Sequence, residues 1–303
     1  MSPNVFSVSL NSYTWGRFNV AQCLEQIRQT PIRAVELPVE QTRPGSLIPE
    51  LMLDTPLRGN WQYSLPDLKE LLARDGFTVD AVDVFGYLGH PGAAPIVRRR
   101  IDFAAALGAK TLVLGCHHLA LAHGPGTAAA AETAEQREAR AGIYAMLREL
   151  GDYAAPKGVR IALEIHGGVT ANADEALRTM AEVNRPNVGI NFDTANILFY
   201  NEALDAAGAA EALQRLARHV FHVHLKDIRR GATRAQNVLP RLGTGEVDFP
   251  AVFRILHGVG FSGPFSFEVE TFHGATASND IAAYQEDVLA SIAYIRSLGE
   301  FSE

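Results

Sequence analysis

Cysteine is scarce in this chain of 303 residues, which contains only Cys23 and Cys116. The two are far apart and no CxxC pattern occurs, so the sequence excludes a disulfide framework and favours the reducing cytoplasm as its compartment. The N-terminal residues lack a basic segment followed by a long apolar core. We therefore expect no secretory signal.

Long apolar runs and clusters of basic residues are also missing. No window approaches the roughly 18 uninterrupted apolar residues of a membrane span, because Arg, Glu and Asp interrupt the alanine-rich stretches. The formal charge is −7 at pH 7, and no Lys/Arg-rich stretch supplies the clustered cations that nucleic-acid phosphates require. We therefore expect no membrane span and no nucleic-acid partner. Hydrophobic residues make up 47% and charged residues 20%, a balance typical of a globular protein.

Short apolar runs alternate with longer helical patterns from end to end. Eight β-rich runs predict strands at 5–10, 33–38, 78–85, 110–115, 159–165, 187–192, 220–225 and 264–270. Eight patterns with apolar residues at three- and four-residue spacing predict helices at 19–29, 65–75, 95–107, 134–155, 173–184, 203–217, 248–258 and 280–297. Each predicted strand is followed by one predicted helix.

This strict alternation predicts a parallel sheet, and eight units are the number that closes a TIM barrel. A doubly wound open sheet is the main alternative, but it predicts a glycine-rich phosphate loop, and the segment NSYTWGRF (11–18) contains none. We therefore predict a single α/β domain over residues 1–303, folded as one (β/α)8 TIM barrel. The long connections at 39–64, 116–133 and 226–247 are expected at its catalytic face.

Polar residues end four consecutive predicted strands, where a barrel interior is expected to contain Val, Ile and Leu. They are, in chain order, Glu164, His166, Asp193, Asn196, His222, His224, Lys226, Glu268 and Glu270. Because side chains alternate along a strand, Glu164 shares a face with His166, and Glu268 with Glu270. In a closed barrel these faces converge near one point.

Several carboxylates and an imidazole in a small volume disfavour one another's ionisation, and a divalent cation resolves this conflict. An oxygen-rich set with a single imidazole suits Mn²⁺, Mg²⁺ or Co²⁺, and Zn²⁺ binds both ligand types as well. The alternative is that each acid pairs with Lys226, Arg229, Arg230 or a backbone amide. Four such strand ends together favour one divalent metal ion.

The sequence resembles the xylose isomerase-like TIM barrels, which include ketose 3-epimerases, hydroxypyruvate isomerase, inosose dehydratase and isomerase and, more distantly, apurinic endonucleases of the endonuclease IV type. The resemblance covers the whole chain and is strongest in LEIH, GINFDTAN, HVHLKD, GTGEVDF and GPFSFEVE. It implies that one metal ion is held by Glu164, Asp193, His224 and Glu268. His224 is preferred to His222 because the metal-binding histidine of the family stands just before the Lys-Asp pair of the HVHLKD motif. Glu270 is the alternative to Glu268.

The resemblance also implies an isomerase or epimerase of a small sugar, keto-sugar or inosose. Glu164 and Glu268 would move a proton next to a carbonyl group, and the metal would stabilise the enediolate as a Lewis acid. The alternative is a lyase or dehydratase that eliminates a β-substituent from a keto-sugar, inosose or 3-keto-glycoside. Thr170 stands where many ketose 3-epimerases have a further Glu, which weakens that particular assignment. A non-catalytic sugar-binding barrel and an apurinic endonuclease-like enzyme are less favoured, because the latter needs histidines at Asn196 and within 232–242.

Several further residues are candidates for binding the carbohydrate substrate: His166, Asn196, Lys226, Arg230, His117 and Glu36. Lys226 would neutralise an enediolate or pair with Asp227. Arg230 lies six residues after His224, a spacing at which ketose epimerases carry a substrate arginine. The sequence leaves open which sugar is used, whether it is phosphorylated, and whether the chain forms a homo-oligomer.

Overall fold

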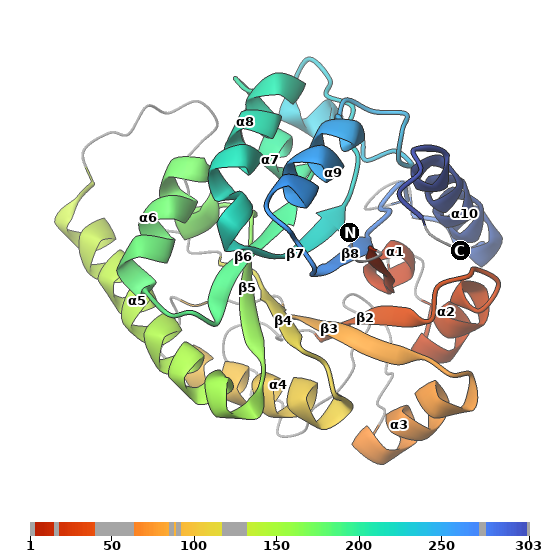
Figure 1. The fold of residues 1–303 in the computed structure, drawn as a ribbon, viewed down its shortest axis with the longest axis horizontal. Coiled ribbons are helices and arrows are strands. Elements are labelled where there is room, and N and C mark those ends of the chain that lie inside the picture. Colours follow the sequence, from red (N-terminus) through yellow and green to blue (C-terminus); the bar gives the residue numbers. More distant parts are fainter. Residues whose placement is uncertain are drawn as a thin grey trace.

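A computed structural model describes residues 4–14, 18–39, 64–84, 88, 92–116, 132–272 and 277–301. In these residues the strands are all parallel and form a closed barrel, in which each pairs with the next and β8 pairs with β1 (Figure 1). The strands are β1 Val5–Ser9, β2 Ala34–Val39, β3 Thr78–Val84, β4 Thr111–Leu114, β5 Arg160–Glu164, β6 Val188–Asp193, β7 Val220–Leu225 and β8 Pro264–Phe267. The predicted TIM barrel is confirmed, while the assignment of the entire chain to one domain stays a prediction.

Helices surround the barrel on its outside (Figure 1). They are α1 Asn11–Thr14, α2 Val20–Ile27, α3 Leu65–Arg74, α4 Ala93–Leu107, α5 Ala134–Ala154, α6 Ala173–Val183, α7 Asn196–Phe199, α8 Ala206–Leu216, α9 Phe249–Gly258 and α10 Ile281–Ser297. Polar caps fix where several begin: Asn19 and Thr133 each form a capping box at the start of α2 and α5. Among the described helices, none has the length and apolarity needed to cross a membrane.

The apolar core lies between the barrel and the helices. Outward-facing strand residues such as Val84 and Phe192 belong to the same buried cluster as Leu147 of α5 and Leu213 of α8. Burial of such apolar surface is the main favourable contribution to folding, at roughly 25 cal/mol per Å². The barrel is therefore stabilised chiefly from its outer face.

The interior of the barrel is polar, which differs from the expected filling with Val, Ile and Leu. Residues paired on neighbouring parallel strands share a face, and Ser266 pairs with both Ser7 and His224. Further buried polar residues on this inner face are Ser9, Glu36, Thr111, Asn191 and His222. The sequence places its large apolar side chains outside the barrel, which leaves the inside for hydrogen-bonding and charged groups.

Two strands each contain one residue that the pairing skips. On β3 this is Asp80: its neighbours Val79 and Ala81 pair with the consecutive residues Val35 and Glu36 of β2. On β7 it is Phe221: its neighbours Val220 and His222 pair with the consecutive residues Ile190 and Asn191 of β6. A one-residue insertion of this kind changes which residues of a strand face inward. Beyond Phe221, His222, His224 and Lys226 share the inner face.

Candidate metal centre

Four acidic or imidazole side chains meet at the carboxyl ends of consecutive strands. Glu164 ends β5, Asp193 ends β6, His224 lies near the end of β7 and Glu268 directly follows β8. All four are buried, with at most 6% of their surface exposed. One ligand atom from each lies within 4.8 Å of the others. The structure thus brings together the four residues that the sequence predicted as a metal-binding set.

The Nδ1 atom of His224 faces an oxygen of each carboxylate. It lies 3.1 Å from Glu268 Oε2, 3.4 Å from Glu164 Oε1 and 3.8 Å from Asp193 Oδ2. Three oxygen donors and one nitrogen donor around a single point form a set that Mn²⁺, Mg²⁺, Co²⁺ and Zn²⁺ all accept. The donor chemistry of these residues therefore fits a divalent cation.

Neighbouring amides fix the orientation of the carboxylates. Asp193 Oδ1 accepts the backbone N–H groups of Ala195 and Asn196 at 2.9 and 2.8 Å. The side chain of Asn196 donates to Glu164 Oε1 at 3.3 Å, and that of Asn11 donates to Glu268 Oε1 at 3.0 Å. For Asp193 and Glu268 the other oxygen is the one that faces His224. Hydrogen bonds thus hold the group in place from its periphery.

Lys226 lies beside the same carboxylates. Its Nζ atom is 2.6 Å from Glu268 Oε2, 2.9 Å from Glu270 Oε2 and 3.2 Å from Asp193 Oδ2. The predicted alternative, an ion pair with Asp227, is wrong, because the Asp227 carboxylate instead accepts backbone N–H groups of its own loop, such as that of Gly245 at 2.8 Å. Lys226 therefore contributes a buried positive charge to the site.

The charges of these groups shift one another's pKa values. Burial raises the pKa of Glu164 to about 7, although His224 acts in the opposite direction. Burial alone would also raise the pKa of Asp193, but the charge of Lys226 lowers it. Burial would likewise raise the pKa of Glu268, but His224 and Lys226 hold it well below its ordinary value. For His224, burial would lower the pKa, but the surrounding carboxylates raise it well above its ordinary value. Positive charge at this point is thus strongly favoured.

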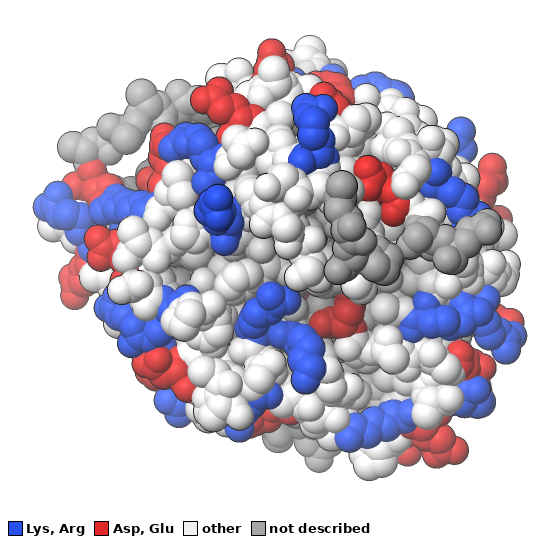
Figure 2. Space-filling model, in the orientation of Figure 1, with Lys and Arg blue, Asp and Glu red and all other residues white. Residues whose placement is uncertain are grey.

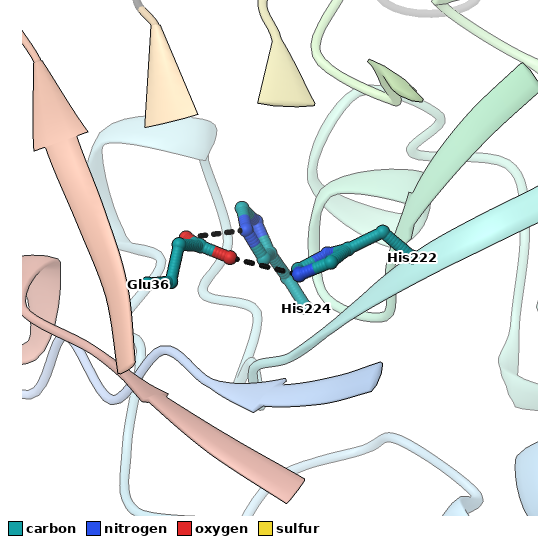
Figure 3. Close-up of side chains that lie close together, drawn as sticks. All are labelled: Glu36, His222 and His224. Carbon is teal, nitrogen blue, oxygen red and sulfur yellow. Dashed lines mark hydrogen bonds and ion pairs between the residues drawn. The ribbon is translucent and has the colours of Figure 1, made fainter. Parts of the chain in front are cut away.

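Glu36 lies below this group, deeper in the barrel. Its carboxylate reaches across from β2 to two imidazoles of β7, with Oε1 3.0 Å from His224 Nε2 and Oε2 3.0 Å from His222 Nε2 (Figure 3). All three side chains have no exposed surface. The sequence suggested Glu36 as a substrate contact, but in the structure both of its oxygens face histidine nitrogens. Asn191 contacts the Nδ1 atoms of both rings, at 3.1 Å for His224 and 2.9 Å for His222.

The other predicted substrate contacts are placed differently. His166 is partly buried and lies against Tyr200, whose hydroxyl is 3.3 Å from the imidazole nitrogens. Arg230 pairs with Glu246 at 2.8 Å and donates to two backbone carbonyls of the segment before α8. His117 lies outside the described residues. The substrate roles of these residues therefore stay predictions.

Sequence reasoning missed several residues around the site. Asn11 donates to Asp83 at 2.8 Å as well as to Glu268, and Asn191 lies between two histidines. The guanidinium of Arg234 lies 4.4 Å from the ring centroid of Phe199. Strand alternation could have identified Asn191, which is two residues before Asp193. No sequence pattern indicates the partners of Asn11 or Arg234, because these contacts join distant segments.

Two curated proteins are similar to this chain in sequence. An L-ribulose 3-epimerase of Methylomonas sp. (strain DH-1) is 33% identical over 177 residues, which cover 57% of this chain and 54% of that protein. An inosose dehydratase of Erwinia tasmaniensis is 33% identical over 195 residues, covering 56% of this chain and 60% of the relative. The chain thus matches between half and two thirds of the length of these two relatives.

A solved structure shows the same fold. The crystal structure of the IOLI protein with a binding zinc atom superposes with a TM-score of 0.68 at 20% identity, covering 99% of this chain and 100% of that one. The sequence also matches the model of the xylose isomerase-like TIM barrel family over residues 24–297, which is most of the chain. The resemblance seen in the motifs is therefore confirmed. The chain belongs to the xylose isomerase-like TIM barrel family.

Proposed function

We propose that this protein is a divalent-metal-dependent isomerase or epimerase of a small sugar, keto-sugar or inosose. The observation that carries the proposal is the convergence of Glu164, Asp193, His224 and Glu268 within 4.8 Å at the catalytic end of the barrel. These four would hold the cation. When bound, it supplies Lewis-acid polarisation of the oxygen atoms next to the reacting carbon.

The remaining chemistry belongs to the side chains. Glu164 and Glu268 approach the same His224 nitrogen from β5 and from the end of β8. We assign them to the two faces of the reacting carbon. One carboxylate removes a proton from that carbon and the other returns a proton to it, as general base and general acid. Lys226, held at Asp193 and Glu268, offsets the negative charge that develops on the substrate oxygen. His166 and Asn196 would bind hydroxyl groups of the sugar.

The similarity to an L-ribulose 3-epimerase supports this reading, since it extends over 57% of the chain. The similarity to an inosose dehydratase favours a second candidate function, a lyase. Both reactions begin by removing a carbon-bound proton. They differ in the next step, because a lyase expels a β-hydroxyl group whereas an epimerase returns a proton.

Finer assignments also belong to this proposal. We favour Mn²⁺, Mg²⁺ or Co²⁺ as the metal, and the zinc atom of the IOLI protein supports Zn²⁺ as a further choice. The carbohydrate is the proposed partner. On the described part of the one face drawn in Figure 2, basic and acidic side chains are interspersed, which favours a small carbohydrate over a nucleic acid at that face. Cys23 and Cys116 are both free and buried, which agrees with the proposed cytoplasmic location. A homo-oligomer is compatible with these assignments.

Turnover in D₂O tests the proposal and separates the two candidates. The metal-loaded protein is incubated with a panel that includes L-ribulose and an inosose, and products are analysed by NMR and mass spectrometry. We expect deuterium on carbon in a product of otherwise unchanged mass, and the exchange should stop after chelation. Loss of water from an inosose would move the assignment to the lyase. Binding without exchange across the whole panel would contradict an enzymatic role.

A further inference from the structure

Glu36 and His222, which lie against the proposed metal ligand His224, are the strongest feature of the barrel interior that the proposed reaction does not use. A buried carboxylate costs several kcal/mol unless it is paired, and Glu36 has no exposed surface. Its two oxygens contact two different imidazoles at the same distance, 3.0 Å (Figure 3). Glu36 is therefore placed to accept hydrogen bonds from both rings deep in the barrel.

The contacts of His224 assign a task to each ring nitrogen. Nε2 faces Glu36 Oε1, while Nδ1 faces the carboxylates of the candidate metal centre. When a cation takes the place of the second ring proton, an imidazole that donates Nε2–H to Glu36 has its lone pair on Nδ1. The side-chain amide of Asn191, 3.1 Å from Nδ1, fits the same tautomer as a donor to that lone pair. A bound cation would take the place of this weak contact.

His222 supports Glu36 from the opposite side. Its Nε2 atom is 3.0 Å from Glu36 Oε2, and its Nδ1 atom is 2.9 Å from Asn191 Oδ1. Asn191 therefore links the two rings on one side, and Glu36 links them on the other. This closed ring of contacts joins β2, β6 and β7, and it leaves the His224 imidazole with one favourable orientation.

We propose that Glu36 is the positioning residue of the metal ligand His224, and that His222 in turn holds the Glu36 carboxylate in place. The inference rests on the metal centre of the proposed function. Glu36 acts by accepting the Nε2 proton, which directs the Nδ1 lone pair toward Glu164, Asp193 and Glu268. Such hydrogen-bonded carboxylates commonly change metal affinity by about 10–100-fold when they are removed.

The first test compares metal affinities of two variants with the parent protein. Glu36→Gln preserves size, but its single carbonyl oxygen can accept from only one of the two histidines. Asp80→Asn is the matched control, because it removes a carboxyl group from β3 that makes no hydrogen bond or ion pair with the His224 ring. The titrations with Mn²⁺ and Zn²⁺ are made at pH 8, above the pKa of about 7 that burial gives Asp80, so that both substitutions remove a charge.

We expect Glu36→Gln to bind both metals about 10–100-fold more weakly than the parent, and Asp80→Asn to stay within about 3-fold of it. The Co²⁺-loaded Glu36→Gln variant should also show a shifted visible spectrum, which reports altered ligand geometry. Equal losses in the two variants would mean that charge alone matters, and the proposal would be wrong. Catalytic turnover is not part of the measurement, so an incorrect substrate assignment leaves the result unaffected.

The second test needs no variant and decides the matter if Glu36→Gln fails to fold. In the Zn²⁺-loaded parent labelled with ¹⁵N-histidine, NMR assigns the protonated and the metal-bound nitrogen of each ring. We expect His224 to bind Zn²⁺ through Nδ1 and to carry its proton on Nε2. Coordination through Nε2 would overturn the proposal, as would a parent protein that binds no divalent metal.

Discussion

At the scale of single residues, Asp193 uses its two carboxylate oxygens for different purposes. Oδ1 accepts two backbone N–H groups at the start of α7, while Oδ2 faces His224 and Lys226. Asp193→Asn keeps a carbonyl oxygen for the first task and replaces the second oxygen with an amide that does not bind cations. We expect at least about 100-fold weaker Mn²⁺ binding in calorimetric titrations. The free energy of unfolding of the metal-free protein should change by about 1 kcal/mol or less.

A second aspartate provides the control for this substitution. Asp205 also accepts a backbone N–H at the start of a helix, from Gly208 at 2.9 Å, but it is exposed and directly precedes α8, away from the metal centre. Asp205→Asn should keep the metal affinity of the parent. If Asp193→Asn kept that affinity as well, Asp193 would not be a metal ligand.

The predicted and the missed residues differ in what determines them. Glu164, Asp193, His224 and Glu268 could be predicted because each lies at a strand end and matches a short motif. The partners of Glu36 and Lys226 could not be predicted, because they depend on which side chains meet across the barrel. Arg230 shows a related limit: its spacing from His224 predicts a substrate contact, which stays a prediction, but no pattern indicates that its guanidinium pairs with Glu246.

At the scale of elements, β6 has no room for a side chain at Gly189. A Cβ atom there would lie 2.5 Å from the ring of Phe221 and 2.6 Å from the backbone oxygen of His219. The backbone contact cannot relax as a flexible side chain would. We expect Gly189→Ala to lower the free energy of unfolding by about 1–3 kcal/mol, measured by urea unfolding.

A glycine of α5 is the matched control for this prediction. A Cβ atom at Gly142 would meet no atom within 4 Å, so Gly142→Ala should be neutral or stabilise the helix by up to about 1 kcal/mol. The double variant Gly189→Ala, Phe221→Leu should regain part of the lost stability. An unchanged unfolding free energy in Gly189→Ala would show that β6 and β7 can separate at no cost.

The eight strands and eight of the ten described α-helices could be predicted from the sequence, whereas the four-residue helix α1 was not expected. The apolar spacing and the caps place α5 and α6 within one residue of their expected ends. The short helix α7 could not be predicted, because its four residues depend on the Asp193 side chain for their first hydrogen bonds. The skipped residues Asp80 and Phe221 leave no signal in the hydrophobic pattern, since each lies within an otherwise regular strand.

At the scale of the whole molecule, Asp80 makes the stability of the fold depend on pH. Burial, together with the charge of Glu36, raises the pKa of Asp80 from 3.8 to about 7. The unfolded chain therefore releases this proton at lower pH than the folded protein does. The contribution of Asp80 to stability is unchanged below about pH 4 and becomes less favourable as pH rises to 7.

Asp80→Asn removes this titration, because an amide resembles the protonated carboxyl group at every pH. We expect the variant to gain stability relative to the parent as pH rises from 5 to 8, by roughly 1–3 kcal/mol after allowance for partial exposure. Urea unfolding of both proteins at the two pH values measures the difference. A difference that stayed constant with pH would mean that Asp80 titrates normally.

The two skipped residues also constrain how this chain can change its length during evolution. Phe221 precedes His222 and His224 on β7, and Asp80 precedes Asp83 on β3, four strands away around the barrel. Deleting either of these residues would leave the following side chains on their present faces, because each is an extra residue without a pairing partner on the neighbouring strand. Deleting a paired residue such as Val223 would instead turn His224 toward the helices, although the amino-acid composition would hardly differ. Single-residue deletions at paired positions of these two strands should therefore be less tolerated than deletion of a skipped residue, whereas surface loops can accept changes in length.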